Sequence, residues 1–300
     1  MKKSGAPGGR AAFAVLSANG TEVLTSGNSR RIISWMYNKD YTTFGLKRAV
    51  RIARRRARQT GEYIMLKIEH LTKTYGEKKA VDDLSLHIRP GEIYGFIGHN
   101  GAGKTTTLKA VVGILQFDAG EIAIDGKSIK TEPLACKREI AYIPDNPDLY
   151  DFMSGIKYLN FIADIFGVGA DDRQARIRDY AARFELTDDL AQPIAAYSHG
   201  MKQKLAIIAA WLHQPKLIIM DEPFVGLDPK AAHLLKGMMR ELCDQGGAIF
   251  FSTHVLEVAE KLCDKVAIIK GGRLIRSGTM EEVKGDDSLE QVFLELEDEA

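Results

Sequence analysis

Short apolar runs alternate with longer amphipathic stretches along most of the chain after residue 65. The runs that predict strands are 67–71, 84–88, 92–97, 140–143, 217–220 and 248–252. Helical patterns cover 105–115, most of 153–212, 229–244 and 254–262. Such alternation is typical of a largely parallel sheet covered by helices. The first three runs follow one another without a long helix, so they predict an antiparallel edge that leads into the main sheet.

Turn signals and chain ends complete the pattern. Asp125-Gly126 is a two-residue hairpin signal, and residues 266–275 form a second predicted hairpin that turns at Gly271-Gly272. A final acidic helix is predicted over 288–296. A membrane-spanning helix needs roughly 18 to 20 apolar residues. The longest apolar stretch, 205–212, has eight residues, so we expect no membrane span.

Charge divides the chain into two parts. Residues 1–64 hold 13 Lys and Arg against 3 acidic residues, whereas residues 65–300 hold 28 against 37. The first part includes the run 54–56 of three arginines and shows little periodicity, so we expect no core there. The predicted organisation is a basic extension, 1–64, followed by one domain, 65–300.

Three interpretations of the basic extension remain open. Its arginines suit nucleic acid or anionic lipid, and an Arg-rich, acid-poor segment also fits a targeting peptide. The third is that translation starts at Met65, which stands directly before the first strand, with 1–64 untranslated or disordered. Thr60-Gly61-Glu62 can be encoded by a bacterial ribosome-binding sequence at a normal spacing before Met65.

The cysteines indicate a reducing, cytoplasmic compartment. Cys136, Cys243 and Cys263 match neither a metal knuckle nor a redox pair in their spacing. Their odd number also argues against a disulfide framework.

A phosphate-binding loop is the first chemical motif. The pattern G-x-x-x-x-G-K-[ST] is met in full by Gly98-His99-Asn100-Gly101-Ala102-Gly103-Lys104-Thr105. An apolar strand runs into this loop and a helix, which includes Thr106, leaves it. Backbone N–H groups and the helix N-terminus favour phosphate. We expect Lys104 to contact the β- and γ-phosphates and the Thr105 hydroxyl to bind Mg²⁺.

An acidic pair follows the buried strand 217–220. Asp221 is the candidate for the magnesium shell. Glu222, one residue farther along, is positioned to act on a water in line with the γ-phosphate, as general base or as the group that orients it.

The ordered motifs resemble the nucleotide-binding subunits of ATP-binding-cassette (ABC) transporters over about residues 66–297. They are Tyr75, the phosphate loop, the signature segment 197–203 (YSHGMKQ), Asp221-Glu222-Pro223, Gly226-Leu227-Asp228-Pro229 and Ser252-Thr253-His254. The resemblance implies an ATPase with an α/β P-loop NTPase (RecA-like) fold. Its mostly parallel sheet would carry an antiparallel β edge subdomain and an inserted α-helical signature subdomain, about 147–212.

Individual roles follow from the same resemblance. Tyr75 would stack on adenine, which an aromatic face suits. His254 would contact the γ-phosphate and hold the Glu222 water. The resemblance places Ser198, His199 and Gly200 at the ATP of an opposite cassette, so that two cassettes close head to tail over two ATP molecules. Asp228 would lie at that interface.

Two positions depart from the family pattern. The signature is usually Leu-Ser-Gly-Gly-Gln, but here Tyr197, His199 and Met201 replace three of the five residues. Asp145 stands where glutamine is common. Its carboxylate can bind Mg²⁺ or its waters but cannot donate a hydrogen bond, which puts the details of coupling to the membrane subunit in doubt.

The family resemblance also implies partners and a location. They are an integral-membrane permease subunit, a second ABC ATPase subunit, identical or different, and the cytoplasmic face of the cell membrane. The apolar and aromatic residues of segment 147–153 suit a short helix from the permease, or they pack the helical subdomain from inside.

The compact chain and its ending resemble ABC type-2 exporters of the multidrug and bacitracin-efflux kind. The alternative is a soluble ABC-type ATPase that acts on nucleic acid or ribosomes. Such proteins usually carry a long coiled coil or two cassettes, whereas 93 positions separate Thr105 from Ser198 here. We therefore expect a transporter subunit, and no nucleic-acid partner.

Overall fold

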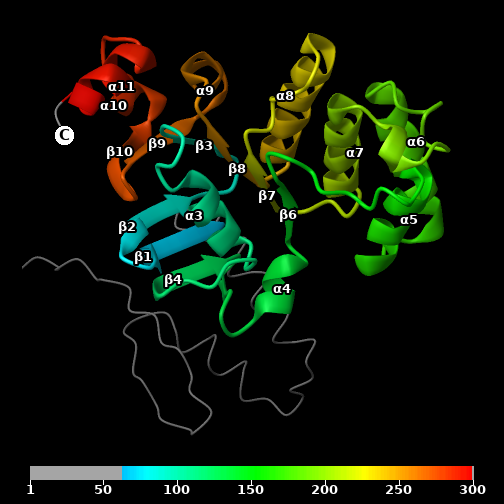
Figure 1. The fold of residues 1–300 in the computed structure, drawn as a ribbon, viewed down its shortest axis with the longest axis horizontal. Coiled ribbons are helices and arrows are strands. Elements are labelled where there is room, and N and C mark those ends of the chain that lie inside the picture. The colour runs from blue at the N-terminus through cyan, green and yellow to red at the C-terminus, as the bar shows by residue number, and fades with distance from the viewer. Residues whose placement is uncertain (1–62, 299–300) are drawn as a thin grey trace, which may run out of the picture. The chain divides into compact units, whose positions relative to one another are not determined.

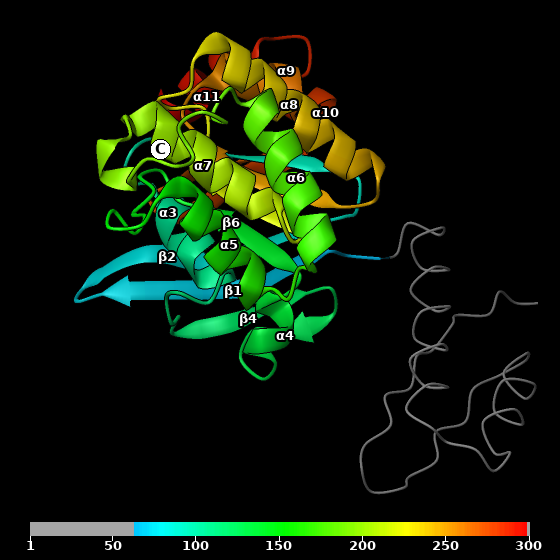
Figure 2. The same ribbon diagram turned by 90° about the vertical axis from the view of Figure 1, so that its right-hand side faces the viewer.

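The computed structural model describes residues 63–298. Nearly all of the predicted basic extension, including its arginine run, lies outside the described residues. The described residues form two sheets with helices around them (Figures 1 and 2).

A six-stranded sheet forms the centre. In spatial order its strands are β10 (Arg273–Thr279), β9 (Lys265–Lys270), β3 (Ile93–Ile97), β8 (Ala248–Thr253), β7 (Leu217–Asp221) and β6 (Ile140–Ile143). All neighbours are parallel except β10, which runs antiparallel to β9. Every residue of β3, β7 and β8 is buried, as expected for strands that are covered on both faces. Parallel strands end at one edge, so the loops after β3, β6, β7 and β8 meet there.

A separate four-stranded sheet carries the predicted antiparallel edge. Its order is β2 (Lys78–Ile88), β1 (Leu66–Tyr75), β4 (Ala119–Ile124) and β5 (Lys127–Ser128). The Asp125-Gly126 turn is confirmed, with positive φ angles of 51° and 73°. Strands β1 and β2 are longer than predicted because their ladder continues past the apolar core to the pair Tyr75–Lys78.

Helices lie around the central sheet. They are α3 (Lys104–Val111), α4 (Pro133–Lys137), α8 (Pro229–Asp244), α9 (Leu256–Leu262), α10 (Met280–Lys284) and α11 (Leu289–Asp298). The α3 helix ends earlier than predicted, since Gly113 turns with φ 68° and the next two N–H groups both bond the Lys109 carbonyl. The α9 helix begins later, because Val255 is extended and its N–H donates to Thr253 Oγ1.

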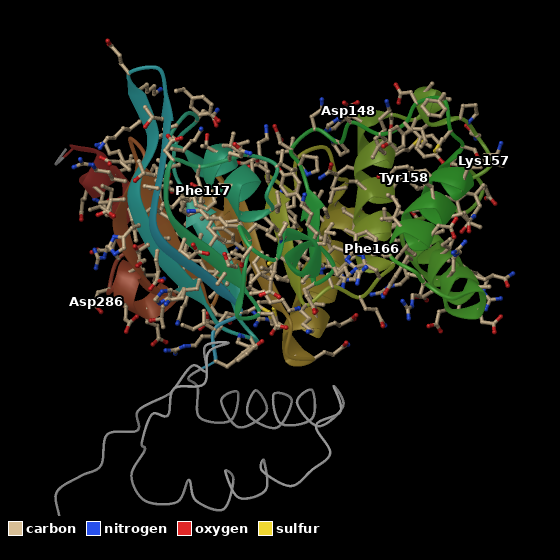
Figure 3. All side chains as sticks on the ribbon, turned by 90° about the horizontal axis from the view of Figure 1, so that it is seen from below. Phe117, Asp148, Lys157, Tyr158, Phe166 and Asp286 are labelled. Atoms are coloured by element: carbon tan, nitrogen blue, oxygen red, sulfur yellow. The ribbon has the colours of Figure 1, made fainter. Side chains whose placement is uncertain are left out.

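The predicted helical region contains α5 (Gly155–Ile165), α6 (Ala170–Arg183), a short 3₁₀ helix (Ile194–Ala196) and α7 (His199–Trp211). Figure 1 shows α5, α6 and α7 together at one end of the domain, with α9, α10 and α11 toward the other. Figure 3 shows Tyr158 and Phe166 at the helical end and Asp286 at the opposite end. One apolar cluster joins both ends, with Leu159 and Leu205 packed in the same core as Val266 and Phe293.

The remaining expectations about the described residues concern cysteines and membrane spans. Cys136, Cys243 and Cys263 are free and buried, and burial raises the pKa of Cys243 to about 12. Between residues 63 and 298, no helix is both long and apolar enough to cross a membrane.

Candidate active site

A cavity of about 340 Å³ opens where the loops after β3, β6 and β7 meet. Most of the predicted nucleotide and metal residues line it. The lining consists of Tyr75, Lys78, Ala80, His99, Asn100, Gly101, Gly103, Lys104, Thr105, Thr106, Asp145, Asp221 and Glu222. Residues that lie far apart in the sequence therefore converge on one hollow, as the order of the parallel strands requires.

The phosphate loop depends on glycine at two crowded positions. Gly103 has φ 110°, and a Cβ atom there would lie 2.3 Å from the Ala80 carbonyl oxygen. A Cβ atom on Gly98 would lie 2.5 Å from the Ile269 carbonyl oxygen. The loop is thus wedged between β2 and β9, and no larger residue fits at either position without moving backbone. Neither Gly98 nor Ala102 lines the cavity, although both belong to the loop.

Lys104 lies inside the loop with 6% of its surface exposed. Its Nζ donates to the Gly98 carbonyl at 2.5 Å and to the His99 carbonyl at 3.3 Å, and lies 3.7 Å from Glu222 Oε1. Burial lowers the pKa of Lys104, while the charges of Glu222 and Asp221 oppose that shift. The ammonium group is therefore held at the base of the cavity, within reach of an anionic ligand.

Thr105 and Asp221 meet at the cavity wall. Thr105 Oγ1 donates to Asp221 Oδ2 at 2.6 Å, and Asp145 faces the same space. Hydroxyl and carboxylate oxygens are the ligands that Mg²⁺ takes, usually one or two from the protein with phosphates and waters completing the shell. These residues fit a magnesium ion bound together with a nucleotide.

Glu222 has a strained backbone, with φ 46°. Its N–H donates to the Ser252 carbonyl at 3.2 Å and to Ser252 Oγ at 3.1 Å. His254 does not line the cavity, but its Nδ1 lies 2.9 Å from Glu222 Oε1. A non-glycine residue in this region costs about 1–3 kcal/mol and is typical of functional sites. In this backbone conformation the Glu222 carboxylate lines the cavity beside Lys104.

Tyr75 ends β1 at the cavity rim, with half of its surface exposed. The Lys73 ammonium lies 5.4 Å from the centre of its ring. An exposed aromatic face at the rim of a polar cavity is available for stacking on a flat ligand.

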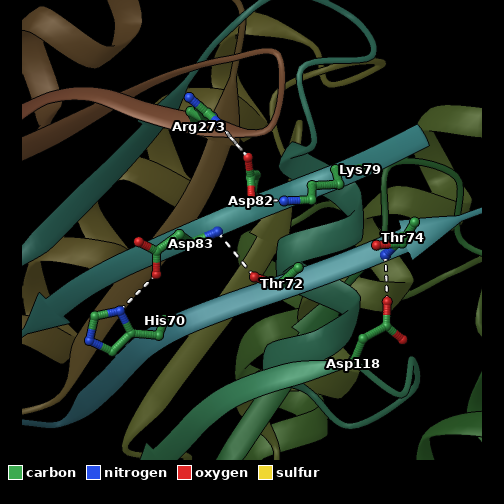
Figure 4. Close-up of polar contacts among 8 residues, drawn as sticks. All are labelled: His70, Thr72, Thr74, Lys79, Asp82, Asp83, Asp118 and Arg273. Atoms are coloured by element: carbon green, nitrogen blue, oxygen red, sulfur yellow. Dashed lines mark hydrogen bonds and ion pairs between the residues drawn. The ribbon is translucent and has the colours of Figure 1, made fainter. Parts of the chain in front are cut away.

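Two lining residues, Lys78 and Ala80, belong to β2 and to none of the sequence motifs. Their strand is fixed to the β9–β10 hairpin near the site. Figure 4 shows Arg273 and Lys79 on Asp82, with Arg273 donating from Nε at 2.9 Å and from Nη2 at 2.7 Å. The Gly272 N–H also donates to the Ala102 carbonyl at 2.9 Å. The hairpin therefore joins β2 and the phosphate loop.

The predicted signature residues and Asp228 do not line this cavity. Ser198 caps α7 and accepts the Met201 N–H at 3.2 Å. Asp228 caps α8, accepting from Ala231 at 2.8 Å, and it also pairs with Lys204 at 2.7 Å, which lowers its pKa. The start of α7 packs on the loop before α8. The two are so close that a Cβ atom added to Gly226 would lie 2.4 Å from the His199 ring.

Ser198, His199 and Asp228 are exposed, whereas Gly200 is partly buried. None of the four lines the cavity.

Ser252 is the polar group that the sequence did not assign to a task. It is fully buried at the end of β8, and its Oγ donates to Asp221 Oδ1 at 2.5 Å. It therefore contacts both members of the acidic pair. Its signal in the sequence is its place in the motif Ser252-Thr253-His254, directly after the apolar run 248–251.

Comparisons with known proteins agree with this geometry. A family model described as "ABC transporter" matches residues 81–225. The chain is 33% identical over 237 residues to the ABC-type transporter ATP-binding protein EcsA of Bacillus subtilis (strain 168), covering 77% of this chain and 96% of EcsA. It is 34% identical over 215 residues to the linearmycin resistance ATP-binding protein LnrL of the same organism, covering 72% and 69% of the two chains.

A solved structure gives the same result. It is described as the structure of the ATP binding subunit of an ABC transporter, and it matches with a TM-score of 0.75 and 34% identity over 78% of this chain and 99% of that chain. The predicted fold, with a mixed parallel sheet and an antiparallel β subdomain, is confirmed. The chain therefore belongs to the ATP-binding subunits of ABC transporters, and it is the subunit that binds and hydrolyses ATP.

Proposed function

We propose that ATP lies in the described cavity with its phosphates on loop 98–105 and its adenine on Tyr75. The glycine-wedged loop aims N–H groups at the cavity, and α3 adds the positive end of its dipole. Lys104 moves from the Gly98 and His99 carbonyls to the β- and γ-phosphates. The carrying observation is that Lys104, Glu222 and the Thr105–Asp221 pair face one cavity.

The hydrolytic step uses Glu222 and His254. A water oxygen attacks the γ-phosphorus, the bond to the β-phosphate oxygen breaks, and ADP leaves. Glu222 orients that water and accepts its proton, while His254 holds the Glu222 carboxylate in place and contacts the γ-phosphate. The 2.9 Å contact between Glu222 and His254 supports this division of roles. Lys104 stabilises the charge on the transferred group.

Mg²⁺ fits beside this step. Thr105 and Asp221 would hold it, with Asp145 binding the ion or one of its waters. When bound, the ion would supply positive charge that offsets the negative charge of the phosphates.

We infer that two such chains, or this chain and a different cassette, close over ATP. Exposed Ser198 and Asp228 lie away from the cavity of their own chain. Ser198 heads α7, whose N-terminus favours an anion, so this surface suits the γ-phosphate in the cavity of an opposite cassette. Gly200 and His199 would lie at the same contact.

A permease subunit is the proposed membrane partner. Phe152 is 82% exposed and Tyr150 is 47% exposed, and the Tyr150 ring lies 5.7–6.2 Å from three other rings, those of Phe152, Tyr158 and Phe161. Leu149 from the same segment is buried in the core. One part of the segment therefore packs inside the domain, and another part presents the aromatic surface that a permease helix would need. Docking there would hold the chain at the cytoplasmic face of the membrane.

Export is the proposed direction. The name of LnrL associates that relative with resistance to linearmycin, and removing a toxic compound from the cell is the simplest way for a transporter to confer resistance. No described residue selects a cargo, because cargo passes through the permease.

The experiment that tests the hydrolytic assignment is Glu222→Gln, which keeps size and hydrogen bonding but removes the base. We expect ATP affinity to stay within about twofold, turnover to fall at least about 100-fold, and an ATP-bound dimer to accumulate in size-exclusion chromatography. Glu257→Gln, on the exposed face of α9, is the matched control. Turnover of Glu222→Gln at the parent rate would show that another group activates the water.

A further inference from the structure

The last helix, α11, contacts the phosphate loop through one pair of rings. Phe293 is 6% exposed, and its ring centroid lies 4.9 Å from that of His99 with an interplanar angle of 63°. Edge-to-face pairs at 4.5–7 Å are a favoured aromatic geometry. His99 itself lines the nucleotide cavity. A residue near the end of the chain thus contacts a wall residue of the site.

The backbone carbonyl of His99 accepts two hydrogen bonds from other residues of the phosphate loop. It accepts the Ala102 N–H at 3.1 Å and the Lys104 ammonium at 3.3 Å. The ring and this carbonyl belong to the same residue, so a change in the backbone angles of His99 that displaced the carbonyl would also move the ring away from Phe293. The Phe293 ring therefore restrains the backbone group that shapes the turn and receives Lys104.

The helix that carries Phe293 is firmly attached to the domain. Leu289 and Val292 are buried. The Leu289 N–H donates to Glu260 Oε2 at 3.3 Å, and Lys270 Nζ donates to the Leu296 carbonyl at 3.3 Å. Lys270 ends β9, the strand whose Ile269 carbonyl lies against Gly98. These contacts hold the Phe293 ring in a fixed position against His99.

We propose that Phe293 is a positioning residue for nucleotide binding, which holds the phosphate loop through the His99 ring. The proposal rests on the proposed placement of the ATP phosphates on loop 98–105. Phe293 sets how well the loop is formed before ATP arrives, so it acts on ATP affinity and not on the hydrolytic step. By reciprocity, bound ATP holds α11 more tightly on the domain.

The test measures ATP affinity and turnover of the full chain with Phe293→Leu, which keeps an apolar side chain but removes the ring. An aromatic pair contributes about 0.5–1.5 kcal/mol beyond area burial, which corresponds to a roughly 2- to 12-fold increase in the dissociation constant of ATP. Turnover at saturating ATP should stay within about twofold of the parent. A structural loss alone would lower the fraction of active protein, and with it the apparent turnover, without changing affinity.

A control and a second pair of variants separate positioning from loosening of α11. Leu289→Val removes buried volume from the same helix one turn earlier, and it should leave ATP affinity unchanged. His99→Ala removes the ring contact while the sequence of α11 stays the same, and it should weaken ATP binding. His99→Phe keeps a ring at this position and should bind ATP more tightly than His99→Ala does. In the His99→Ala background, Phe293→Leu should have no further effect on affinity.

Hydrogen exchange gives a readout that is independent of activity. Saturating ATP should slow amide exchange in α11 of the parent chain, and by less in Phe293→Leu. If the parent chain binds ATP and Phe293→Leu has the same ATP affinity and the same amide exchange in α11 as the parent, this inference is wrong while the proposed function stands. Failure of the parent chain to bind ATP would overturn the proposed function together with it.

Discussion

Ser252→Ala tests whether the Ser252 hydroxyl stabilises the acidic pair Asp221-Glu222. The Ser252 hydroxyl is fully buried. It donates to Asp221 Oδ1 at 2.5 Å and accepts the Glu222 N–H at 3.1 Å. Removing this one oxygen leaves a carboxylate that is 2% exposed without that donor, whereas the Glu222 N–H keeps the Ser252 carbonyl at 3.2 Å.

The magnitude follows from these two contacts. A hydrogen bond to a charged group contributes about 1.5–3 kcal/mol, and a neutral one about 0.5–1.5 kcal/mol. Since the Glu222 N–H retains a partner, most of the loss comes from Asp221, and we expect the free energy of unfolding to fall by about 3 kcal/mol. For a domain of this size that corresponds to a decrease of roughly 6–12 °C in the melting temperature. Turnover should fall more than ATP affinity, because Glu222 is no longer held from the side-chain oxygen.

Urea unfolding of the nucleotide-free protein measures the stability change, with the fluorescence of buried Trp211 as one of the signals. The matched control is Ser154→Ala, because Ser154 precedes α5 without a side-chain cap hydrogen bond; it should stay within about 0.5 kcal/mol of the parent. If Ser252→Ala also stayed within that margin, the buried contact with Asp221 would not contribute as the geometry indicates.

Two further predictions concern binding and pH. Lys104→Ala should weaken ATP binding itself, because the ammonium at the base of the cavity is lost, and unchanged affinity in equilibrium binding would count against the loop. Burial lowers the pKa of His213, whose ring stacks on Phe166 and contacts the Ile140 carbonyl. The fold therefore favours the neutral ring, so stability is complete above the unfolded pKa of about 6.5 and falls below it by up to about 1.4 kcal/mol per pH unit. His213→Phe should lose that part of the slope in urea unfolding measured from pH 7.5 to 5.5, and an unaltered slope would refute the assignment.

The chemistry at the strand ends could be predicted because it is encoded locally. The phosphate loop and Asp221-Glu222 each adjoin an apolar run, and parallel strands bring such ends together. The Asp125-Gly126 turn was equally readable from two residues. The start of α10 is encoded locally too, by the capping box between Thr279 and Glu282.

The parts that could not be predicted depend on contacts between distant segments. Ser252 is an ordinary polar residue in the sequence, and its task appears only when β8 lies beside β7. The ring contact of His99 with Phe293 likewise depends on how α11 packs. The end of α3 differs from the prediction because backbone hydrogen bonds around Gly113 decide where the helix ends. Hydrophobic periodicity carries no information about such bonds.

The central claim is that this ATPase works for a membrane permease, and capture from native membranes tests it most directly. C-terminally tagged protein would be recovered from detergent-solubilised membranes, with mass spectrometry of its partners. The parent chain and Ile165→Asp, changed at an exposed apolar residue on α5, should recover a polytopic membrane protein. Phe152→Asp should lose it, because a charge then lies in the aromatic surface. Recovery of ribosomes or nucleic acid alone, with no membrane protein, would contradict the account.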